Sequence, residues 1–141
     1  MTPRWPSVLW IVRHGQSAGN VARDLAEAQG LGRIAMASRD VDVPLSELGC
    51  DQSRALGRWI AQSGAEAAPD VILASPYIRA IQTAELFRAA GGCAPDLPIC
   101  IDERLREKEF GTFNRLTKAG ILARFPEEGA RRDQIRKFYY R

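Results

Sequence analysis

The chain has 141 residues, a formal net charge of +3, three cysteines and one histidine. A hydrophobic fraction of 45% and a charged fraction of 26% are ordinary for a globular protein, and the length suits one domain and excludes a multidomain assembly. The single histidine excludes any site that takes two imidazoles from these residues.

The positive charge is concentrated at the C-terminus. Residues 131–141 carry a net +4, whereas the first 130 residues carry −1. The body of the chain therefore lacks a uniformly basic surface, and we predict no nucleic-acid partner. The tail offers an alternative, because its basic residues and Phe138, Tyr139 and Tyr140 are suited to nucleic-acid binding. The spacing of Ile135, Phe138 and Tyr139 instead favours an amphipathic helix.

Apolar runs and cysteine usage bear on the compartment. No run approaches the roughly 20 residues of a membrane span, and the N-terminus lacks the pattern of a secretory signal, so we predict no membrane partner. Cys50, Cys93 and Cys100 are odd in number and lack CxxC spacing. This pattern argues against a disulfide framework or a zinc site and fits a reducing compartment. We predict a cytoplasmic protein with structural thiols and no metal.

The first half of the chain predicts one strand and two helices. The continuous apolar run 8–12 predicts a strand buried on both faces of a parallel sheet. A helix is expected from Ser17 to about Ala28, followed by a loop over 32–44. Ser46 is placed to cap a long amphipathic helix that stops near Gly64. The expected apolar stripe of that helix is Leu48, Leu56, Trp59 and Ile60.

The second half predicts two more strands and three helices. Residues 71–74 read as a second buried strand, and Ser75-Pro76 then places a cap and a first-turn proline before a helix that ends at Gly91-Gly92. Residues 97–101 indicate a third strand despite Pro98. A loop is expected over 102–113, with helices over 116–125 and 130–140. Strands alternating with helices imply βαβ units in an α/β fold.

Chemically suggestive residues follow all three predicted strands. In open α/β sheets, ligands bind at the carboxyl ends of the strands. The segments that follow the strands are Arg13-His14-Gly15-Gln16-Ser17 with Asn20, then 75–84 with Arg79, then 103–111 with three glutamates. The recurrence of such residues after each strand predicts one site at one sheet edge.

The residue types suit phosphoryl transfer. A neutral imidazole is nucleophilic, and guanidinium charge beside His14 disfavours its protonated form. Arg13 and Arg79 offer bidentate grips for phosphate oxygens. A nearby carboxylic acid would protonate the leaving oxygen, and Glu103, Glu107 and Glu109 all compete for this role on spacing alone.

Four segments resemble the histidine phosphatase superfamily, also called the phosphoglycerate mutase-like family. They are Arg13-His14-Gly15-Gln16-Ser17 with Asn20, Asp42-Val43-Pro44-Leu45-Ser46 with Gly49, Ser75-Pro76 with Arg79-Ala80 and Gln82-Thr83-Ala84, and Leu105-Arg106-Glu107 with Phe110-Gly111. The resemblance covers nearly the whole chain but only the first part of the family domain. It implies a three-layer α/β/α sandwich with a mainly parallel sheet, incomplete at the C-terminus.

The resemblance also implies roles for individual residues. His14 is the nucleophile that becomes phosphohistidine, Arg13 and Arg79 bind the phosphate, and Asn20 donates a further hydrogen bond to it. Glu107 matches the proton donor. Ser17 and Ser38 are weaker candidates for substrate contacts. The family needs no metal and no organic cofactor.

The chain departs from the family at the second histidine, which family members carry after a later strand. No second histidine is present. We therefore expect residues 1–141 to be a single domain truncated before that segment. We also expect such a chain to be inactive or weakly active, and its exposed apolar sheet edge to pair with another copy of the chain.

The sequence favours a phosphatase (a hydrolase of phosphomonoesters) that acts on a small phosphorylated substrate. A mutase of the same family, which returns the phosphoryl group to substrate, is the first alternative. A non-catalytic phosphate-binding module is the second, because the second histidine is absent.

Overall fold

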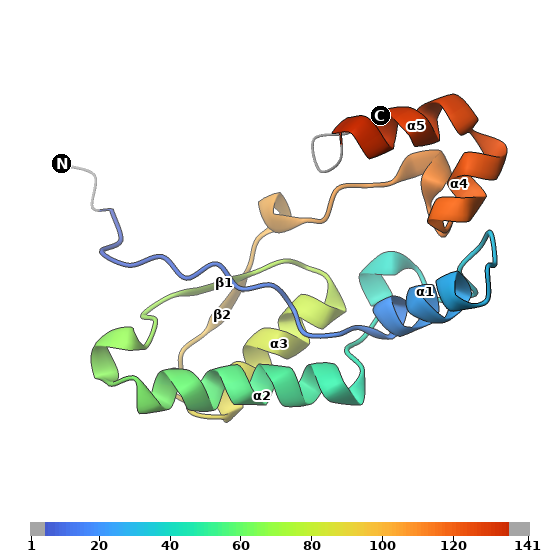
Figure 1. Cartoon of the computed structure of the whole chain (residues 1–141). Coiled ribbons are helices and arrows are strands. Elements are labelled where there is room, and N and C mark those ends of the chain that lie inside the picture. The colour runs from blue at the N-terminus through green and yellow to red at the C-terminus, as the bar shows by residue number, and fades with distance from the viewer. Residues whose placement is uncertain (1–4, 136–141) are drawn as a thin grey trace.

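The computed structural model describes residues 5–135 (Figure 1). Its helices and strands, in chain order, are α1 (Ala18–Ala28), α2 (Glu47–Gln62), β1 (Ile72–Ala74), α3 (Ile78–Ala89), β2 (Ile99–Ile101), α4 (Lys118–Arg124) and α5 (Pro126–Ile135). Four short 3-10 turns are η1 (Asp40–Asp42), η2 (Ala65–Ala67), η3 (Glu103–Leu105) and η4 (Gly111–Phe113). The loops predicted over 32–44 and 102–113 thus contain short turns of helix.

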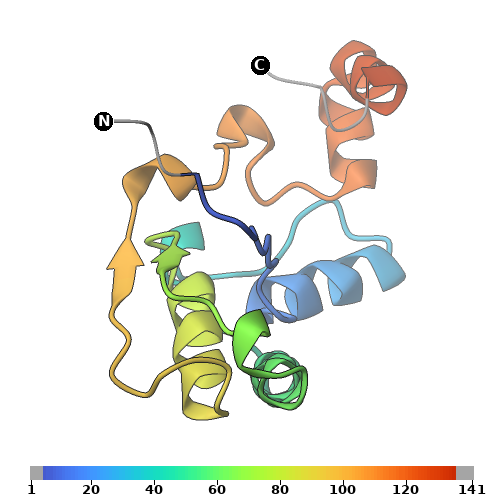
Figure 2. The ribbon, with the colours of Figure 1, turned by 90° about the vertical axis from the view of Figure 1, so that its left-hand side faces the viewer.

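The centre of the fold is a βαβ unit (Figure 2). β1 and β2 pair in parallel with Ile72 opposite Ile99 and Ala74 opposite Ile101, and α3 connects them. The alternation of strands and helices therefore predicted the correct α/β class. The parallel pairing brings the carboxyl ends of both strands, and the segments that follow them, to the same edge.

The predicted strand over residues 8–12 is wrong for this structure. The segment runs from the N-terminal end toward α1 without regular secondary structure (Figure 1). All five side chains are exposed, Ile11 by 90%. No backbone hydrogen bond joins the segment to β1 or β2 within residues 5–135. Trp10 packs edge-on against Trp59 of α2 at 5.9 Å between ring centroids. An apolar run becomes a buried strand only where neighbouring strands and helices cover it.

The strand predicted over residues 71–74, which is β1 in the structure, is also not buried on both faces. Ala74 is buried against the helices, whereas Leu73 is 57% exposed and Val71, expected within the strand, precedes it and is exposed as well. Cys100, which lies opposite Leu73 in the register, is exposed too. One face of the β1–β2 pair is therefore open in the described part of the chain. Pairing of this open sheet with another copy stays a prediction.

α2 and α3 pack closely because small residues line α2. Its buried residues are Gly49, Ser53, Gly57 and Ile60. A Cβ at Gly57 would lie 2.4 Å from the Phe87 carbonyl oxygen of α3, so only glycine permits this approach. The predicted apolar stripe is thus wrong except for Ile60 and the half-buried Leu56, since Leu48 and Trp59 are exposed.

Polar caps begin three of the helices. Ser17, Ser46 and Thr117 accept hydrogen bonds from backbone N–H groups in the first turns of α1, α2 and α4. The caps at Ser17 and Ser46 confirm the predicted helix starts. The prediction for α3 is wrong by two residues, because Ser75 and Pro76 precede the helix and Tyr77 occupies the cap position without a side-chain bond.

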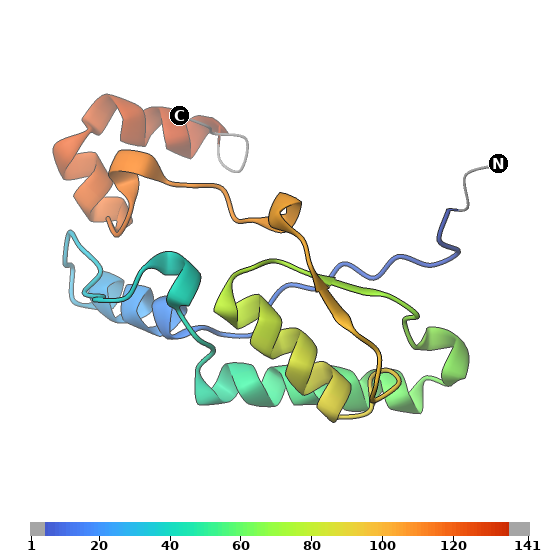
Figure 3. The same cartoon turned by 180° about the vertical axis from the view of Figure 1, so that it is seen from behind.

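α4 and α5 form a separate hydrophobic cluster at the end of the molecule that lies beside α1 (Figure 3). Phe113, Leu116 and Ile121 are buried, and Phe125 and Ile135 pack on them. The predicted helix 116–125 is shorter than expected, and the predicted helix 130–140 instead begins at Pro126. Residues 136–141, with the predicted aromatic stripe of Phe138 and Tyr139, lie outside the described residues. Among residues 5–135, none of the helices is long and apolar enough to span a lipid bilayer.

Candidate functional site

The segment that carries His14 follows no strand in residues 5–135, yet it meets the segments that follow β1 and β2. His14 and Arg79, 65 positions apart in sequence, are in direct contact, with Arg79 Nε 3.2 Å from His14 Nε2. Glu107, which follows β2, lies near enough for its charge to raise the pKa of His14. Arg79 after β1 and Glu107 after β2 thus converge with His14, although no strand precedes His14 within residues 5–135. The roles expected for the three residues stay predictions.

The hydrogen bonds of His14 define its tautomer. Nδ1 lies 2.6 Å from the carbonyl oxygen of Gly15, which can only accept, so Nδ1 carries the proton. Nε2 accepts from the Arg79 guanidinium, which can only donate, so Nε2 carries a lone pair. The structure thus holds the ring with a nucleophilic nitrogen facing Arg79.

The pKa of His14 is lowered from its ordinary value of 6.5. Partial burial is the largest cause, because it disfavours the charged ring, and the charges of Arg79 and Arg13 lower the pKa further. The hydrogen bond to Gly15 and the charge of Glu107 act in the opposite direction. The prediction that guanidinium charge disfavours the imidazolium is confirmed in direction, with burial as the larger effect.

Arg79 is a buried cation on the first turn of α3, with a side chain only 8% exposed. Besides His14, it donates from Nη1 to the carbonyl oxygen of Asp40 at 2.7 Å. The Asp40 carboxylate lies 3.2 Å from Nη1 and 3.3 Å from Nη2. The guanidinium also stacks over the Tyr77 ring at 4.6 Å. Arg79 is therefore held on three sides by backbone, carboxylate and ring.

The three candidate acids differ in their neighbours. The carboxylate of Glu103 lies 3.2 Å from Nη1 of Arg106, and the charges of Glu103 and Glu109 both raise the pKa of Arg106. Glu107 is the one of the three whose charge acts on His14. All three side chains belong to exposed residues, so each is accessible to solvent.

The other predicted site residues have varied settings. Arg13 is exposed and acts on His14 through its charge. Ser17 and Asn20 form a capping box, in which Asn20 Oδ1 accepts from the Ser17 backbone N–H and Ser17 Oγ, each at 3.0 Å. The box uses the amide oxygen of Asn20, so the hydrogen bond expected from Asn20 to a phosphate would have to come from its amide nitrogen. Ser38 is exposed, and its carbonyl oxygen accepts from Arg115.

The remaining motif residues position the His14 loop. Ser46 donates from Oγ to Gln16 Oε1 at 2.7 Å and from its backbone N–H to the Gln16 carbonyl at 2.9 Å. Gln82 of α3 accepts from the Leu45 backbone N–H at 2.8 Å. A Cβ on Gly49 would lie 2.0 Å from the Gln16 carbonyl oxygen, so the loop rests directly on the start of α2.

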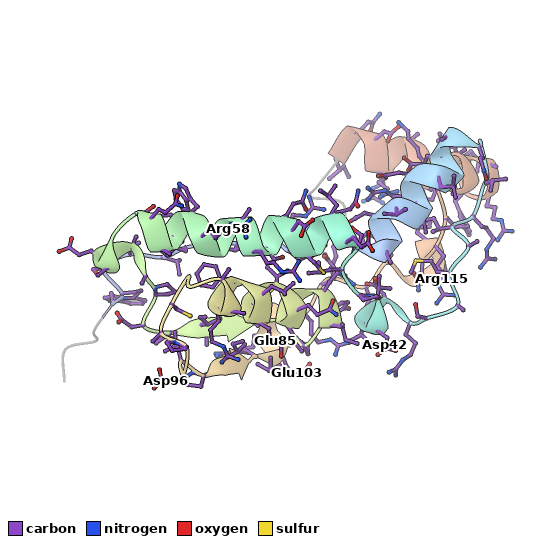
Figure 4. All side chains as sticks on the ribbon, turned by 90° about the horizontal axis from the view of Figure 1, so that it is seen from below. Asp42, Arg58, Glu85, Asp96, Glu103 and Arg115 are labelled. Atoms are coloured by element: carbon purple, nitrogen blue, oxygen red, sulfur yellow. The ribbon has the colours of Figure 1, made fainter. Side chains whose placement is uncertain are left out.

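Arg115 ties the segment that carries Asp40 to the α4–α5 unit (Figure 4). Its guanidinium donates to the carbonyl oxygens of Met36 and Ser38 at 2.6 and 2.7 Å. The backbone of Arg115 has a φ of 60°, which is uncommon for a residue with a side chain. No sequence pattern predicts this anchor or the Asp40–Arg79 contact, because both join residues far apart in the chain.

Within residues 5–135, no group of three or more His, Cys, Asp or Glu side chains is placed to bind a metal ion. The site thus consists of an imidazole, two guanidinium groups and carboxylates. Groups of these types are chemically suited to bind an oxyanion and to offer it a nucleophile.

The model of the histidine phosphatase superfamily (branch 1) matches residues 9–139. The chain belongs to this superfamily. The resemblance deduced from four short segments is confirmed, and so is the phosphoglycerate mutase-like α/β fold.

Relatives in this superfamily carry different activities. The 2,3-bisphosphoglycerate-dependent phosphoglycerate mutase of Methylobacterium sp. (strain 4-46) is 33% identical over 121 residues, which are 86% of this chain and 51% of the mutase. The fructose-2,6-bisphosphatase TIGAR of Xenopus tropicalis is 34% identical over 103 residues, which are 73% of this chain and 32% of that protein. This chain therefore spans about half the length, or less, of these relatives.

Solved structures of the superfamily have the same fold. A mycobacterial glucosyl-3-phosphoglycerate phosphatase in complex with VO3 superimposes with a TM-score of 0.59 at 31% identity, over 84% of this chain and 46% of that one. Both mutases and phosphatases thus occur among proteins similar to this chain.

Proposed function

We propose that this chain carries phosphomonoesterase chemistry, with His14 as the nucleophile. The observation that carries the proposal is the pair of hydrogen bonds to the His14 ring. The Gly15 carbonyl holds the proton on Nδ1, and the Arg79 Nε–H points at the Nε2 lone pair from 3.2 Å. A nucleophile and a phosphate-binding guanidinium therefore face the same point.

The first step forms a bond between His14 Nε2 and phosphorus and breaks the bond from phosphorus to the ester oxygen. Arg79 shifts its Nε–H from the lone pair to a phosphate oxygen, and Arg13 neutralises a second oxygen. The lowered pKa of His14 keeps the ring neutral and nucleophilic near pH 7. Asn20 donates a further hydrogen bond from its amide nitrogen to the phosphate.

Glu107 is proposed as the acid that gives its proton to the leaving oxygen. Water then attacks phosphorus, the bond from phosphorus to Nε2 breaks, and the proton of the water returns to Glu107. Phosphate leaves and the enzyme is restored. The charge of Glu107 acts on His14, whereas Glu103 is paired with Arg106, which supports Glu107 over its neighbours.

The test uses p-nitrophenyl phosphate with the wild-type chain and His14→Ala, each freed of any histidine tag. We expect phosphate release from the wild type, weak because only one imidazole is present, and none from the variant. Alkaline quenching during turnover should trap phosphohistidine, whose assignment is unambiguous in a chain with one histidine.

Glu103→Gln serves as the matched control for Glu107→Gln. Loss of a general acid typically costs about 10²–10⁴ in rate, and the loss should be greatest for alkyl phosphates, whose leaving groups need a proton. Full activity of His14→Ala would refute His14 as the nucleophile. Equal losses of rate in Glu107→Gln and Glu103→Gln would refute Glu107 as the general acid.

Mutase-type phosphotransfer is a second candidate, supported by the similarity to phosphoglycerate mutases. It predicts that phosphoenzyme survives exposure to water and transfers its phosphoryl group to added 3-phosphoglycerate. If the phosphoenzyme loses its phosphoryl group rapidly to water, at a rate that added 3-phosphoglycerate does not change, the phosphatase is favoured.

A phosphate-binding module without turnover is the third candidate, supported by the presence of one histidine. It predicts phosphate binding that depends on Arg79, with no phosphohistidine at any time of quenching. Detection of phosphohistidine would exclude this candidate.

A further inference from the structure

The Asp40 carboxylate contacts the terminal nitrogens of Arg79, the guanidinium to which the proposed function assigns phosphate binding. The Arg79 side chain is only 8% exposed, so its charge is largely removed from water and needs a counter-charge. The Asp40 carboxylate supplies it, through contacts to both Nη1 and Nη2. Two nitrogens of the fork that would grip a phosphate are therefore already occupied by a carboxylate.

The contacts of Asp40 with Arg79 are unequal in length. The Asp40 carbonyl oxygen accepts from Nη1 at 2.7 Å, whereas the carboxylate contacts are 3.2 and 3.3 Å. Charge-assisted N–H to O hydrogen bonds are usually about 2.7–2.9 Å long, so the carboxylate is held loosely for a pair of opposite charges. The backbone contact is the tighter of the two and keeps Arg79 oriented without the carboxylate.

The surroundings of Asp40 allow its side chain to move while its backbone stays. The side chain is 47% exposed, so the carboxylate can turn into water once a phosphate group replaces it as the counter-charge of Arg79. The backbone of the same segment is anchored on both sides, by Arg115 at Met36 and Ser38 and by Val43, which is 2% exposed.

We propose that Asp40 is a built-in competitor for phosphate, whose carboxylate contacts Arg79 and is displaced when a phosphate group binds to Nη1 and Nη2. The proposal rests on the proposed function, since it takes the site of His14 and Arg79 as the place where phosphate binds. Asp40 thereby sets phosphate affinity and favours release of inorganic phosphate, the product. A phosphate group that takes Nη1 and Nη2 must displace the Asp40 carboxylate, whose negative charge stays nearby.

Asp40→Asn tests the proposal, because the amide keeps the shape and one acceptor oxygen but loses the charge. Asp42→Asn is the matched control. Asp42 lies two residues away on the same turn (Figure 4), where its carboxylate pairs with the exposed Arg39 at 2.7 Å. Asp40→Glu, which retains a carboxylate, is the second variant.

The measurement is the dissociation constant for inorganic phosphate, followed through the ring resonances of His14 in ¹H–¹³C NMR spectra. One histidine gives one set of signals, and the same spectra report whether each variant is folded. We expect phosphate to bind Asp40→Asn about tenfold more tightly than wild type, because a like charge near the anion is removed. Asp42→Asn should change the constant by less than about twofold, since its exposed charge is screened. Asp40→Glu should bind no more tightly than wild type.

The outcomes separate this inference from the proposed function. If wild type binds phosphate and Asp40→Asn binds it equally or more weakly, the competitor role is overturned while the phosphate site stands. If Asp42→Asn gains as much affinity for phosphate as Asp40→Asn does, the effect comes from net charge alone, and the competitor role is overturned as well. If Asp40→Asn binds phosphate and wild type does not, both proposals are supported, because the Asp40 carboxylate then blocks the site in wild type. If neither protein binds phosphate, both proposals fail.

Discussion

Of the single methyl groups that could be added to α2, the one introduced by Gly49→Ala should disturb the neighbouring His14 loop the most. The new Cβ would lie 2.0 Å from the Gln16 carbonyl oxygen and 2.9 Å from its carbon. Both are backbone atoms, so no flexible side chain can move aside. Because Gln16 is two residues from His14, relief of the clash must move the segment that carries the nucleophile.

Two opposing effects set the size of the change. Replacing glycine by alanine within a helix stabilises it by at most about 1 kcal/mol. Forcing a methyl group into a closely packed contact costs about 1–3 kcal/mol, with the upper end expected where backbone meets backbone. We therefore expect Gly49→Ala to lower the free energy of unfolding by about 2 kcal/mol, roughly a thirtyfold change in the folded-to-unfolded ratio.

Gly19→Ala is the control, since Gly19 also lies in the first turn of a helix. There the new Cβ would lie 3.3 Å from Cγ1 of Val43, a side-chain atom that can yield. We expect this variant to stay within about 1 kcal/mol of wild type in urea unfolding. We also expect the His14 ring resonances to shift in Gly49→Ala and not in Gly19→Ala. Equal stabilities and unshifted resonances in the two variants would refute the close approach of loop and helix.

Two further predictions concern stability and pH. Thr117→Val should lower the free energy of unfolding by about 2–4 kcal/mol, because it removes the cap of α4 and takes the hydroxyl of the buried Thr117 away from its two partners, the Leu31 carbonyl and the buried Gly120 N–H. Thr117→Ser keeps the hydroxyl and should cost about 1 kcal/mol in urea unfolding, so equal losses in both would argue against the cap. Arg13→Ala should raise the pKa of His14 and Glu107→Gln should lower it, as followed by NMR titration; shifts of the same sign would contradict the geometry. Because the folded-state pKa of His14 lies below its ordinary 6.5, the folded ring binds fewer protons than the unfolded one, and its contribution to stability is lost as pH falls from 6.5 toward the folded value.

Local sequence signals predicted the elements and the family well. Cap residues at Ser17 and Ser46 marked the starts of α1 and α2, and the short apolar runs marked β1 and β2. The rule that ligands gather after parallel strands correctly related Arg79 and Glu107, which follow β1 and β2, to His14, although the strand expected before His14 does not form. Each of these signals depends on residues close together in the chain or on a general property of α/β sheets.

Features that depend on residues far away in the chain are the ones for which the sequence-based predictions are wrong. The run 8–12 has the composition of a buried strand, but burial requires partners that the run itself does not encode. The inner face of α2 was assigned to its large apolar residues, whereas the close approach of α3 selects Gly49, Ser53 and Gly57. Helix periodicity does not show how near the next helix lies. The prediction that residues 1–141 form a single domain stays a prediction.

By itself, the sequence determined the chemistry of the site: a single imidazole flanked by arginine, a second arginine after a strand, and a glutamate after another. The tertiary structure decided how these groups are held. It placed the proton of His14 on Nδ1 through Gly15, and it put Asp40 against Arg79 from 39 residues away. Neither arrangement follows from residue type, because a tautomer and an ion pair depend on which atoms the folded backbone brings within hydrogen-bond distance.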